Sequence, residues 1–262
     1  MESIGTALQA IAQRLLSKQP TASKPVKYFE PSCELCSDTG WLTTSQGARS
    51  CDCARAKRVV QKLAALNRRY SKFAEFDLMA LRPRSDIHPA QAGLIPAIQA
   101  DPEMSLLMFG DTGTGKTLIG YTVAKYAIEQ GRPVVAITLA ELLDQYRTQA
   151  RDAEKLPLID AETLRSGGAG KFLIFIDEID KTRPTEFAGE KFFQLANAIY
   201  ETGQQVIIAS NLPKSHLMAH WERAGQGDFN GEFSQYGAPI LRRFSEVENS
   251  AEVDFFSGRV TR

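Results

Sequence analysis

Residues 110–117 read Gly110-Asp111-Thr112-Gly113-Thr114-Gly115-Lys116-Thr117 and fit the pattern G-x-x-x-x-G-K-[ST] at every fixed position. The glycines allow the backbone to wrap around phosphate groups, Lys116 is expected to reach the β- and γ-phosphate oxygens, and Thr117 to bind Mg²⁺. An apolar strand over 105–109 and a helix over 118–130, stopped by Gly131, supply the context that the pattern requires. The stretch predicts a site for ATP and Mg²⁺, with a chance glycine turn as the alternative.

Further apolar runs lie downstream of this loop, at 133–137, 172–176 and 206–209. Unbroken runs of this kind are typical of parallel strands that helices cover on both faces. The predicted fold class is therefore α/β, with a parallel-sheet P-loop core.

Two acidic residues, Asp177 and Glu178, directly follow the run at 172–176. An acid at the end of a buried strand is expected beside the magnesium ion, which is the role predicted for Asp177. Glu178 can then act as the general base that activates the attacking water. The alternative is that Glu178 caps the next helix.

Two more positions downstream are candidates for catalysis. Asn211 closes the strand that begins at residue 206, where its side chain could hold the water, or could simply be a turn residue. Arg242 and Arg243 follow the apolar pair Ile240-Leu241, and their alternative is a solvated basic pair on a helix.

All four cysteines of the chain, Cys33, Cys36, Cys51 and Cys53, lie in one short segment. Such clustering favours a metal site over disulfides, which would join distant parts of the chain. Four thiolates suffice for a tetrahedral, structural Zn²⁺ site, and Asp38-Thr39-Gly40 supplies a tight turn after the first pair. An iron–sulfur cluster and free buried thiols are the alternatives.

The rest of the chain suggests three parts. Residues 1–27 are expected to form an amphipathic helix over 3–17 and a linker, and 28–80 the cysteine segment and a basic helix over 54–70. Residues 81–262 are expected to form the ATPase domain, entered through a connector that is punctuated by four prolines, namely Pro83, Pro89, Pro96 and Pro102.

The stretch Ile208-Ala209-Ser210-Asn211-Leu212-Pro213 resembles the sensor-1 region of AAA+ ATPases, and the arginine pair stands where they carry the arginine finger. Only 18 residues follow Phe244, so an AAA+ core without the helical lid is expected. With the upstream cysteines and Tyr236-Gly237, the chain resembles bacterial replicative helicase loaders of the DnaC/DnaI type. The related IstB-type transposition ATPases share the same core and are the alternative.

The resemblance implies a homo-oligomer or spiral in which Arg243, or alternatively Arg242, reaches the neighbour's γ-phosphate. It also implies a hexameric DnaB-type replicative helicase and single-stranded DNA as partners. DNA contacts are expected within 139–170, which contains Tyr146, Arg147, Arg151 and Lys155, although a solvated surface would look the same. Arg259 is the candidate for a sensor-2 residue.

Composition limits the other possibilities. Lys plus Arg equals Asp plus Glu at 31 each, so any DNA contact has to come from a local patch. No apolar run approaches the roughly 18 residues of a membrane span, and no signal peptide is recognisable, so a cytoplasmic protein without membrane contact is expected. A small-molecule P-loop kinase and a zinc adaptor with a vestigial P-loop are the competing functions.

Overall fold

The computed structural model describes residues 33–45, 47–84, 88–152, 159–166, 170–223 and 236–261. The chain divides into two compact units, with the boundary between Ala54 and Arg55. The amphipathic helix predicted over 3–17 and the linker after it lie outside the described residues. From Arg55 onward, the basic helix predicted over 54–70 belongs to the unit that holds the large sheet.

The first unit contains an antiparallel hairpin that we had not predicted. Strand β1 (Trp41–Thr44) pairs with β2 (Gly47–Ser50), and Trp41 lies opposite Ser50. The pairing continues where the Cys51 amide donates to the Gly40 carbonyl over 2.8 Å. The hairpin therefore returns the second pair of cysteines to the turn that follows the first pair.

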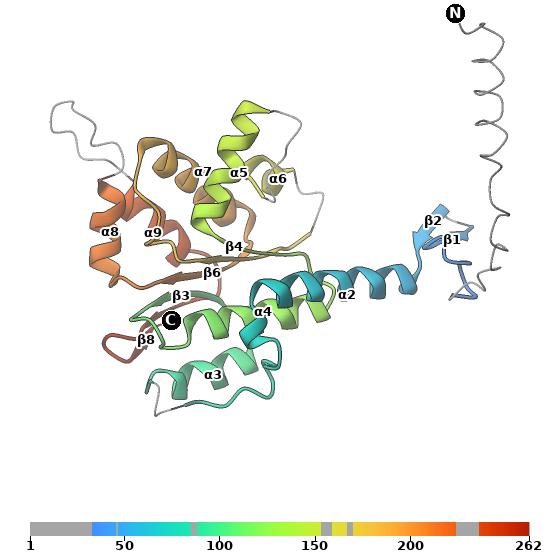
Figure 1. Cartoon of the computed structure of the whole chain (residues 1–262), viewed down its shortest axis with the longest axis horizontal. Helices are drawn as coiled ribbons and strands as arrows, with labels where there is room; N and C mark the ends of the chain where they lie inside the picture. The colour runs from blue at the N-terminus through green and yellow to red at the C-terminus, as the bar shows by residue number, and fades with distance from the viewer. Residues whose placement is uncertain are drawn as a thin grey trace, which may run out of the picture. The chain divides into compact units, whose positions relative to one another are not determined.

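The second unit is built on a six-stranded sheet with the order β4-β5-β6-β3-β7-β8 (Figure 1). Its strands are β3 (Ser105–Phe109), β4 (Val134–Thr138), β5 (Leu173–Asp177), β6 (Gln205–Ser210), β7 (Ser250–Asp254) and β8 (Arg259–Thr261). The first five in that order are parallel, and β8 pairs antiparallel with β7. The parallel α/β prediction is confirmed, and β7 and β8 are strands that we had not predicted.

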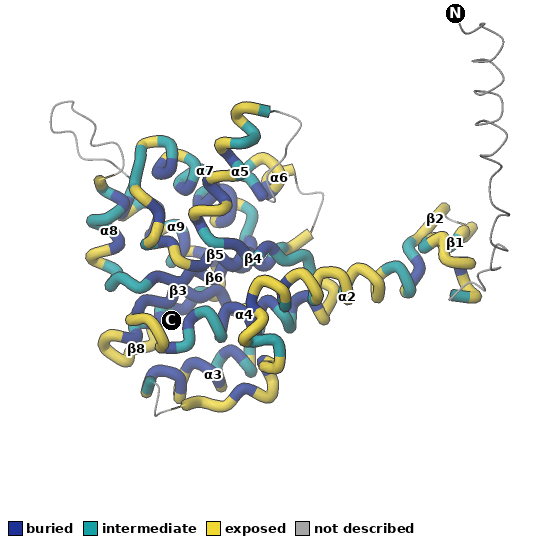
Figure 2. Tube along the Cα trace, viewed as in Figure 1, coloured by how far each residue is buried: buried dark blue, intermediate teal, exposed yellow. Residues whose placement is uncertain are grey.

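Helices cover both faces of this sheet. They are α2 (Asp52–Arg69), the 3₁₀ turn η1 (Ser71–Phe73), α3 (Gln91–Ala100), α4 (Lys116–Glu129), α5 (Leu139–Arg151), α6 (Ala161–Arg165), α7 (Glu186–Thr202), α8 (Lys214–Glu222) and α9 (Gly237–Ser245). Figure 1 shows α3 and α4 on one side of the sheet and α5 and α7 on the other. Alternate residues of β3 divide between the two cores, Leu106 and Met108 on the α4 side and Leu107 and Phe109 on the α7 side. Both cores are buried (Figure 2).

The connector expected around the prolines contains a helix, α3, that we had not predicted. Helix α3 contains Pro96 and presents Leu94, Ile95 and Ile98 to the core, each at most 1% exposed. A proline inside a helix costs about 3 kcal/mol. Burial of three large aliphatic side chains, each contributing about 1.5–3 kcal/mol, outweighs that cost. Tertiary packing therefore overrides the local signal.

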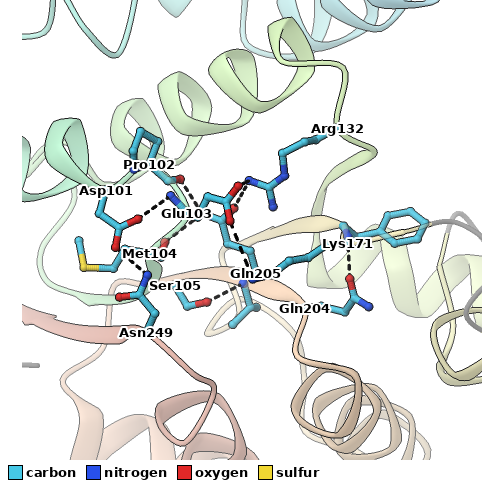
Figure 3. Close-up of polar contacts among 12 residues, drawn as sticks. Asp101, Pro102, Glu103, Met104, Ser105, Arg132, Lys171, Gln204, Gln205 and Asn249 are labelled. Atoms are coloured by element: carbon cyan, nitrogen blue, oxygen red, sulfur yellow. Dashed lines mark hydrogen bonds and ion pairs between the residues drawn. The ribbon is translucent and has the colours of Figure 1, made fainter.

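Side chains join the amino ends of the strands at the edge opposite the glycine loop (Figure 3). The side-chain nitrogen of Gln205 donates to the Pro102 and Met104 carbonyls over 2.9 and 3.0 Å. Its side-chain oxygen accepts from Arg132 over 2.7 Å. The neighbouring Gln204 accepts the Phe172 amide over 2.6 Å. Satisfying these buried groups fixes the strand starts, so that the carboxyl ends are held in register.

The strand order decides what meets at the carboxyl edge. Strand β6 lies between β3 and β5, so the segments that follow all three strands are neighbours there. Those segments begin at Gly110, Glu178 and Asn211. In the part of the chain that the structure describes, no helix is long and apolar enough to cross a membrane.

Candidate functional site

The loop at 110–115 adopts a conformation that only glycine tolerates at several positions. Gly113 and Gly115 have φ angles of +91° and +97°, in the left-handed region. At Gly110 the constraint is space, because a Cβ atom there would lie 2.4 Å from the Phe255 Cβ atom. Helix α4 begins directly afterwards, so its free amino-terminal N–H groups point into the loop, as an anion site requires.

Lys116 lies at the centre of this loop. Its ammonium group donates to the Gly110 and Asp111 carbonyls over 2.7 and 2.8 Å, and to the Thr114 hydroxyl over 3.3 Å. Burial lowers the pKa of Lys116, and the carboxylates of Asp177, Asp180 and Asp111 oppose that shift. A buried cation held by backbone oxygens is suited to receive a phosphate group.

Asp177 ends β5 and is buried beside the start of α4. Burial raises the pKa of Asp177, while hydrogen bonds from the Thr117 side chain and the Glu178 amide act in the opposite direction. The Glu178 amide lies 2.9 Å from the carboxylate. The Thr117 hydroxyl and the Asp177 carboxylate therefore lie near each other, and both offer oxygen ligands of the kind that Mg²⁺ prefers.

Glu178 is exposed and has a φ angle of +53°, which is uncommon for a residue with a side chain. Its carbonyl accepts the Lys181 amide over 3.1 Å and closes a tight turn. Helix α7 does not begin until Glu186, and its cap is Thr185, whose hydroxyl accepts the Ala188 amide over 3.2 Å. The alternative in which Glu178 caps the next helix is therefore wrong.

Asn211 follows β6 and lies between the glycine loop and the Glu178 turn. The Gly110 amide donates to the Ser210 carbonyl over 3.2 Å, and the Ile179 amide donates to the Ala209 carbonyl over the same distance. The end of β6 is therefore bonded to both neighbouring segments. The structure brings together Lys116, Thr117, Asp177, Glu178 and Asn211 at one edge of the sheet.

The arginine pair lies on α9, away from this group. Arg242 is 74% exposed and forms an ion pair with Glu246 at 2.6 Å. Arg243 is 37% exposed, donates to the Asn197 side chain over 2.8 Å and lies over the Tyr200 ring, so α7 holds it. Arg259 lies on the edge strand β8, paired in register with Asp254.

The four cysteine sulfurs form a cluster in the first unit, all within 4.8 Å of one another. The Cys33–Cys51 and Cys36–Cys53 pairs lie 3.8 and 3.2 Å apart. In a tetrahedral site with Zn–S bonds of about 2.3 Å, sulfurs lie about 3.8 Å apart, so the arrangement fits zinc. The predicted turn is present, with Asp38 and Gly40 at positive φ and the Thr39 amide bonded to the Cys36 carbonyl. A hydrogen bond from the Cys53 thiol lowers the pKa of Cys36 to about 7.

The segment expected to contact DNA is only partly available on the surface. Tyr146 is buried in the core and donates to the Ile159 carbonyl over 2.9 Å, so it is unsuitable for that role. Arg147 lies over the Phe187 ring and Arg151 is exposed at the end of α5. Lys155 lies outside the described residues.

Two residues at the site escaped the sequence analysis. The Gln91 side chain, buried in α3, donates to the Thr114 carbonyl over 2.8 Å and supports the glycine loop from a segment far upstream. Asp180 accepts hydrogen bonds from Asn211. Its position in Asp177-Glu178-Ile179-Asp180 is a signal that could have identified Asp180, whereas nothing local distinguishes Gln91.

Comparison with known proteins agrees with this geometry. Residues 106–226 match the model of the family described as "ATPase family associated with various cellular activities (AAA)". The chain contains an AAA ATPase domain. All residues brought together at the carboxyl edge lie within the matched range.

Relatives in sequence include two chromosomal replication initiator proteins, both named DnaA. The protein of Lachnoclostridium phytofermentans is 26% identical over 165 residues, which are 62% of this chain and 35% of that protein. The protein of Gloeobacter violaceus is 26% identical over 197 residues, which are 71% of this chain and 42% of that protein. This chain therefore spans less than half the length of either relative.

Solved structures with similar folds include AMPPCP-bound DnaA from Aquifex aeolicus, with a TM-score of 0.47 and 17% identity over 69% of this chain and 49% of that one. The DnaI crystal structure has a TM-score of 0.48 and 13% identity, and the match covers 69% of this chain and 89% of DnaI. The crystal structure of the DnaC helicase loader has a TM-score of 0.48 and 15% identity, and the match covers 69% of this chain and 98% of that one. The assignment of the AAA domain rests on the family match and not on these weak likenesses.

Proposed function

We propose that this chain is an ATP-dependent loader or remodeller of a replicative DNA helicase, which hydrolyses ATP at subunit interfaces and contacts single-stranded DNA. The observation that carries the ATPase part is the strand order, which brings the ends of β3, β5 and β6 and the segments after them together at one edge of the sheet. These strand ends and segments carry Lys116 and Thr117, Asp177 and Glu178, and Asn211. These groups supply every function that phosphoryl transfer to water needs within one subunit.

In the proposed reaction, the glycine loop and Lys116 hold the phosphates. Thr117 and Asp177 would hold Mg²⁺, which supplies positive charge against the β- and γ-phosphate oxygens. Glu178 accepts a proton from water while the water oxygen attacks the γ-phosphorus and the bond to the β–γ bridging oxygen breaks. The products are ADP and inorganic phosphate.

The arginine pair would complete a neighbour's site in a homo-oligomer or spiral. An arginine from a second subunit stabilises the charge that develops on the transferred phosphoryl group. Arg242 is twice as exposed as Arg243, and Arg243 is engaged by α7. We therefore rank Arg242 ahead of Arg243, although the resemblance to AAA+ ATPases favoured Arg243.

The helicase-loading part rests on the resemblance of the motifs and the upstream cysteines to helicase loaders. It is further supported by the names of the two relatives, which are replication initiators. The cysteine cluster is proposed to bind one structural Zn²⁺ ion, because its four sulfurs lie at distances that fit a closed tetrahedral site. A small unit of this kind can present a surface to a partner protein.

The test combines turnover with partner capture. Phosphate release and binding of a fluorescent ATP analogue are measured for the full chain, Lys116→Ala and Glu178→Gln. Lys116→Ala is expected to lose binding, whereas Glu178→Gln binds normally and loses turnover by about 100-fold or more. Normal turnover by Glu178→Gln contradicts the assignment of the base.

A pull-down from the native host, with Glu178→Gln as bait in the presence of ATP, is probed for the replicative helicase. The expected result is enrichment of the helicase over a Lys116→Ala bait. Enrichment of a transposase instead would favour the IstB-like alternative.

A further inference from the structure

A second buried acid, Asp180, lies next to the proposed catalytic group. Its side chain is 4% exposed, although it follows Glu178 by only two residues in a surface turn. Burying a carboxylate is costly unless hydrogen bonds and charges compensate. The partners of Asp180 therefore indicate what this residue does.

The hydrogen-bond donors that contact the Asp180 carboxylate are groups of Asn211. The Asn211 backbone amide donates to the Asp180 Oδ1 atom over 2.9 Å. The Asn211 side-chain amide reaches both carboxylate oxygens, over 3.5 Å to Oδ1 and 3.3 Å to Oδ2. One carboxylate thus binds Asn211 through its main chain and its side chain together.

This contact determines the orientation of the Asn211 amide. A side-chain amide has a donating NH₂ end and an accepting oxygen end, and a carboxylate only accepts. Placing the oxygen end against Asp180 would bring acceptors together, so the NH₂ end has to face the carboxylate. The oxygen end, Oδ1, is therefore turned away from Asp180.

Backbone hydrogen bonds on either side hold Asp180 and Asn211 close to each other. Ile179, between Glu178 and Asp180, donates to Ala209 of β6, and the same strand end is bonded to Gly110. The turn that carries the proposed base and the strand that carries Asn211 are therefore joined by the backbone and closed by Asp180. The Asp180 charge also acts on Lys116, where it opposes the loss of the proton.

We propose that Asp180 is a positioning residue, which holds Asn211 so that its amide oxygen accepts a hydrogen from the water that Glu178 deprotonates. This inference rests on the proposed ATPase function and adds a residue to it. Asp180 itself does not touch the reacting atoms. Its loss should lower the turnover number far more than it weakens nucleotide binding.

The experiment is a double-mutant cycle on the full chain, with Asp180→Ala, Asn211→Ala and both together. Turnover number, KM, the Kd for a fluorescent ATP analogue and Tm are measured for each. We expect Asp180→Ala to lower the turnover number by about 10–100-fold with a change in Kd below about 3-fold. In the Asn211→Ala background, Asp180→Ala should lower it by less than about 3-fold further.

Two further variants protect the test against misfolding and charge effects. Asp180→Asn keeps the shape of the side chain and one oxygen that can still accept from the Asn211 main-chain amide, but it removes the charge and the second acceptor, so it should lose less turnover than Asp180→Ala at an unchanged fold. Lys181→Ala removes the ion-pair partner at 3.8 Å and should leave turnover within about 2-fold of the unsubstituted chain.

Specific results would overturn the proposal. An unchanged turnover number for Asp180→Ala, or a further loss of about 10–100-fold when Asp180→Ala is added to Asn211→Ala, shows that Asp180 does not act through Asn211. If the unsubstituted chain releases no more phosphate than Lys116→Ala, the ATPase function fails and the role of Asp180 fails with it. The two failures are distinguished by the activity of the unsubstituted chain.

Discussion

At the scale of single residues, the chain accepts unfavourable conformations where the proposed chemistry lies. Glu178 has a positive φ angle, and Lys116 and Asp177 are both charged groups whose pKa values are shifted by burial toward the neutral form. A residue with a side chain in the left-handed region costs roughly 1–2 kcal/mol. The rest of the AAA domain has to offset that cost.

Replacing Glu178 with glycine should therefore separate stability from activity. Glu178→Gly is expected to raise the free energy of unfolding by up to about 1 kcal/mol, because glycine accepts the positive φ angle. Phosphate release should be lost at the same time. Chemical denaturation and an ATPase assay measure the two effects.

A matched control is Glu190→Gly in α7, where glycine is expected to cost about 1 kcal/mol because the backbone is helical. A loss of stability in Glu178→Gly as large as that in Glu190→Gly would contradict the strain at Glu178.

At the scale of elements, the contact between α4 and β5 positions the lysine and the acid relative to each other. Gly120 in α4 lies against the Phe175 ring in β5, and a Cβ atom at residue 120 would lie 2.4 Å from the ring. This close approach places Thr117, about one helical turn before Gly120, near Asp177, two residues after Phe175. The sequence predicted the helix and the strand, but no local pattern distinguishes Gly120 from a glycine without a neighbour.

Two glycines in helices should consequently respond in opposite directions to the same change. Gly120→Ala is expected to destabilise the chain by about 1–3 kcal/mol through overpacking and to weaken Mg²⁺-dependent ATP binding. Gly93→Ala, in α3 with no atom near the added Cβ, should stabilise it by about 0.5–1 kcal/mol. Denaturation curves measure both, and equal effects would rule out the close contact at Gly120.

The cysteine cluster is also an element with its own test. Metal analysis of the purified chain is expected to give one zinc per chain, and Cys36→Ser should lose the metal because a thiolate ligand is removed. ATP binding by Cys36→Ser should stay within about 3-fold of the unsubstituted chain, because the cluster belongs to the other compact unit. Iron with visible absorbance would instead indicate an iron–sulfur cluster.

At the scale of the whole molecule, the AAA domain carries an exposed arginine on α9, Arg242, whose ion pair is with Glu246. A site that lacks its arginine in one subunit can receive it from the next one when the subunits repeat. Hydrolysis should therefore depend on contact between subunits.

Mixing two inactive variants tests this dependence. Arg242→Ala and Glu178→Gln are each expected to hydrolyse ATP poorly, whereas a 1:1 mixture should recover roughly a quarter of normal activity if subunits assemble at random. Arg243→Ala is carried through the same mixing as the comparison. If neither arginine variant, mixed with Glu178→Gln, gives more activity than the average of the two separate proteins, an arginine finger at these positions is excluded.

The sequence by itself determined the phosphate-binding loop, four of the parallel strands, the two acids at the end of β5 and the cysteine cluster. Each of these depends on interactions between residues close in the chain, through glycine torsions, apolar runs or ligand spacing. The tertiary structure decided that Pro96 lies within a helix, that Arg243 is held by α7, and that Gln91 supports the site. Those outcomes depend on packing and hydrogen bonds between elements far apart in the chain, for which no local pattern exists.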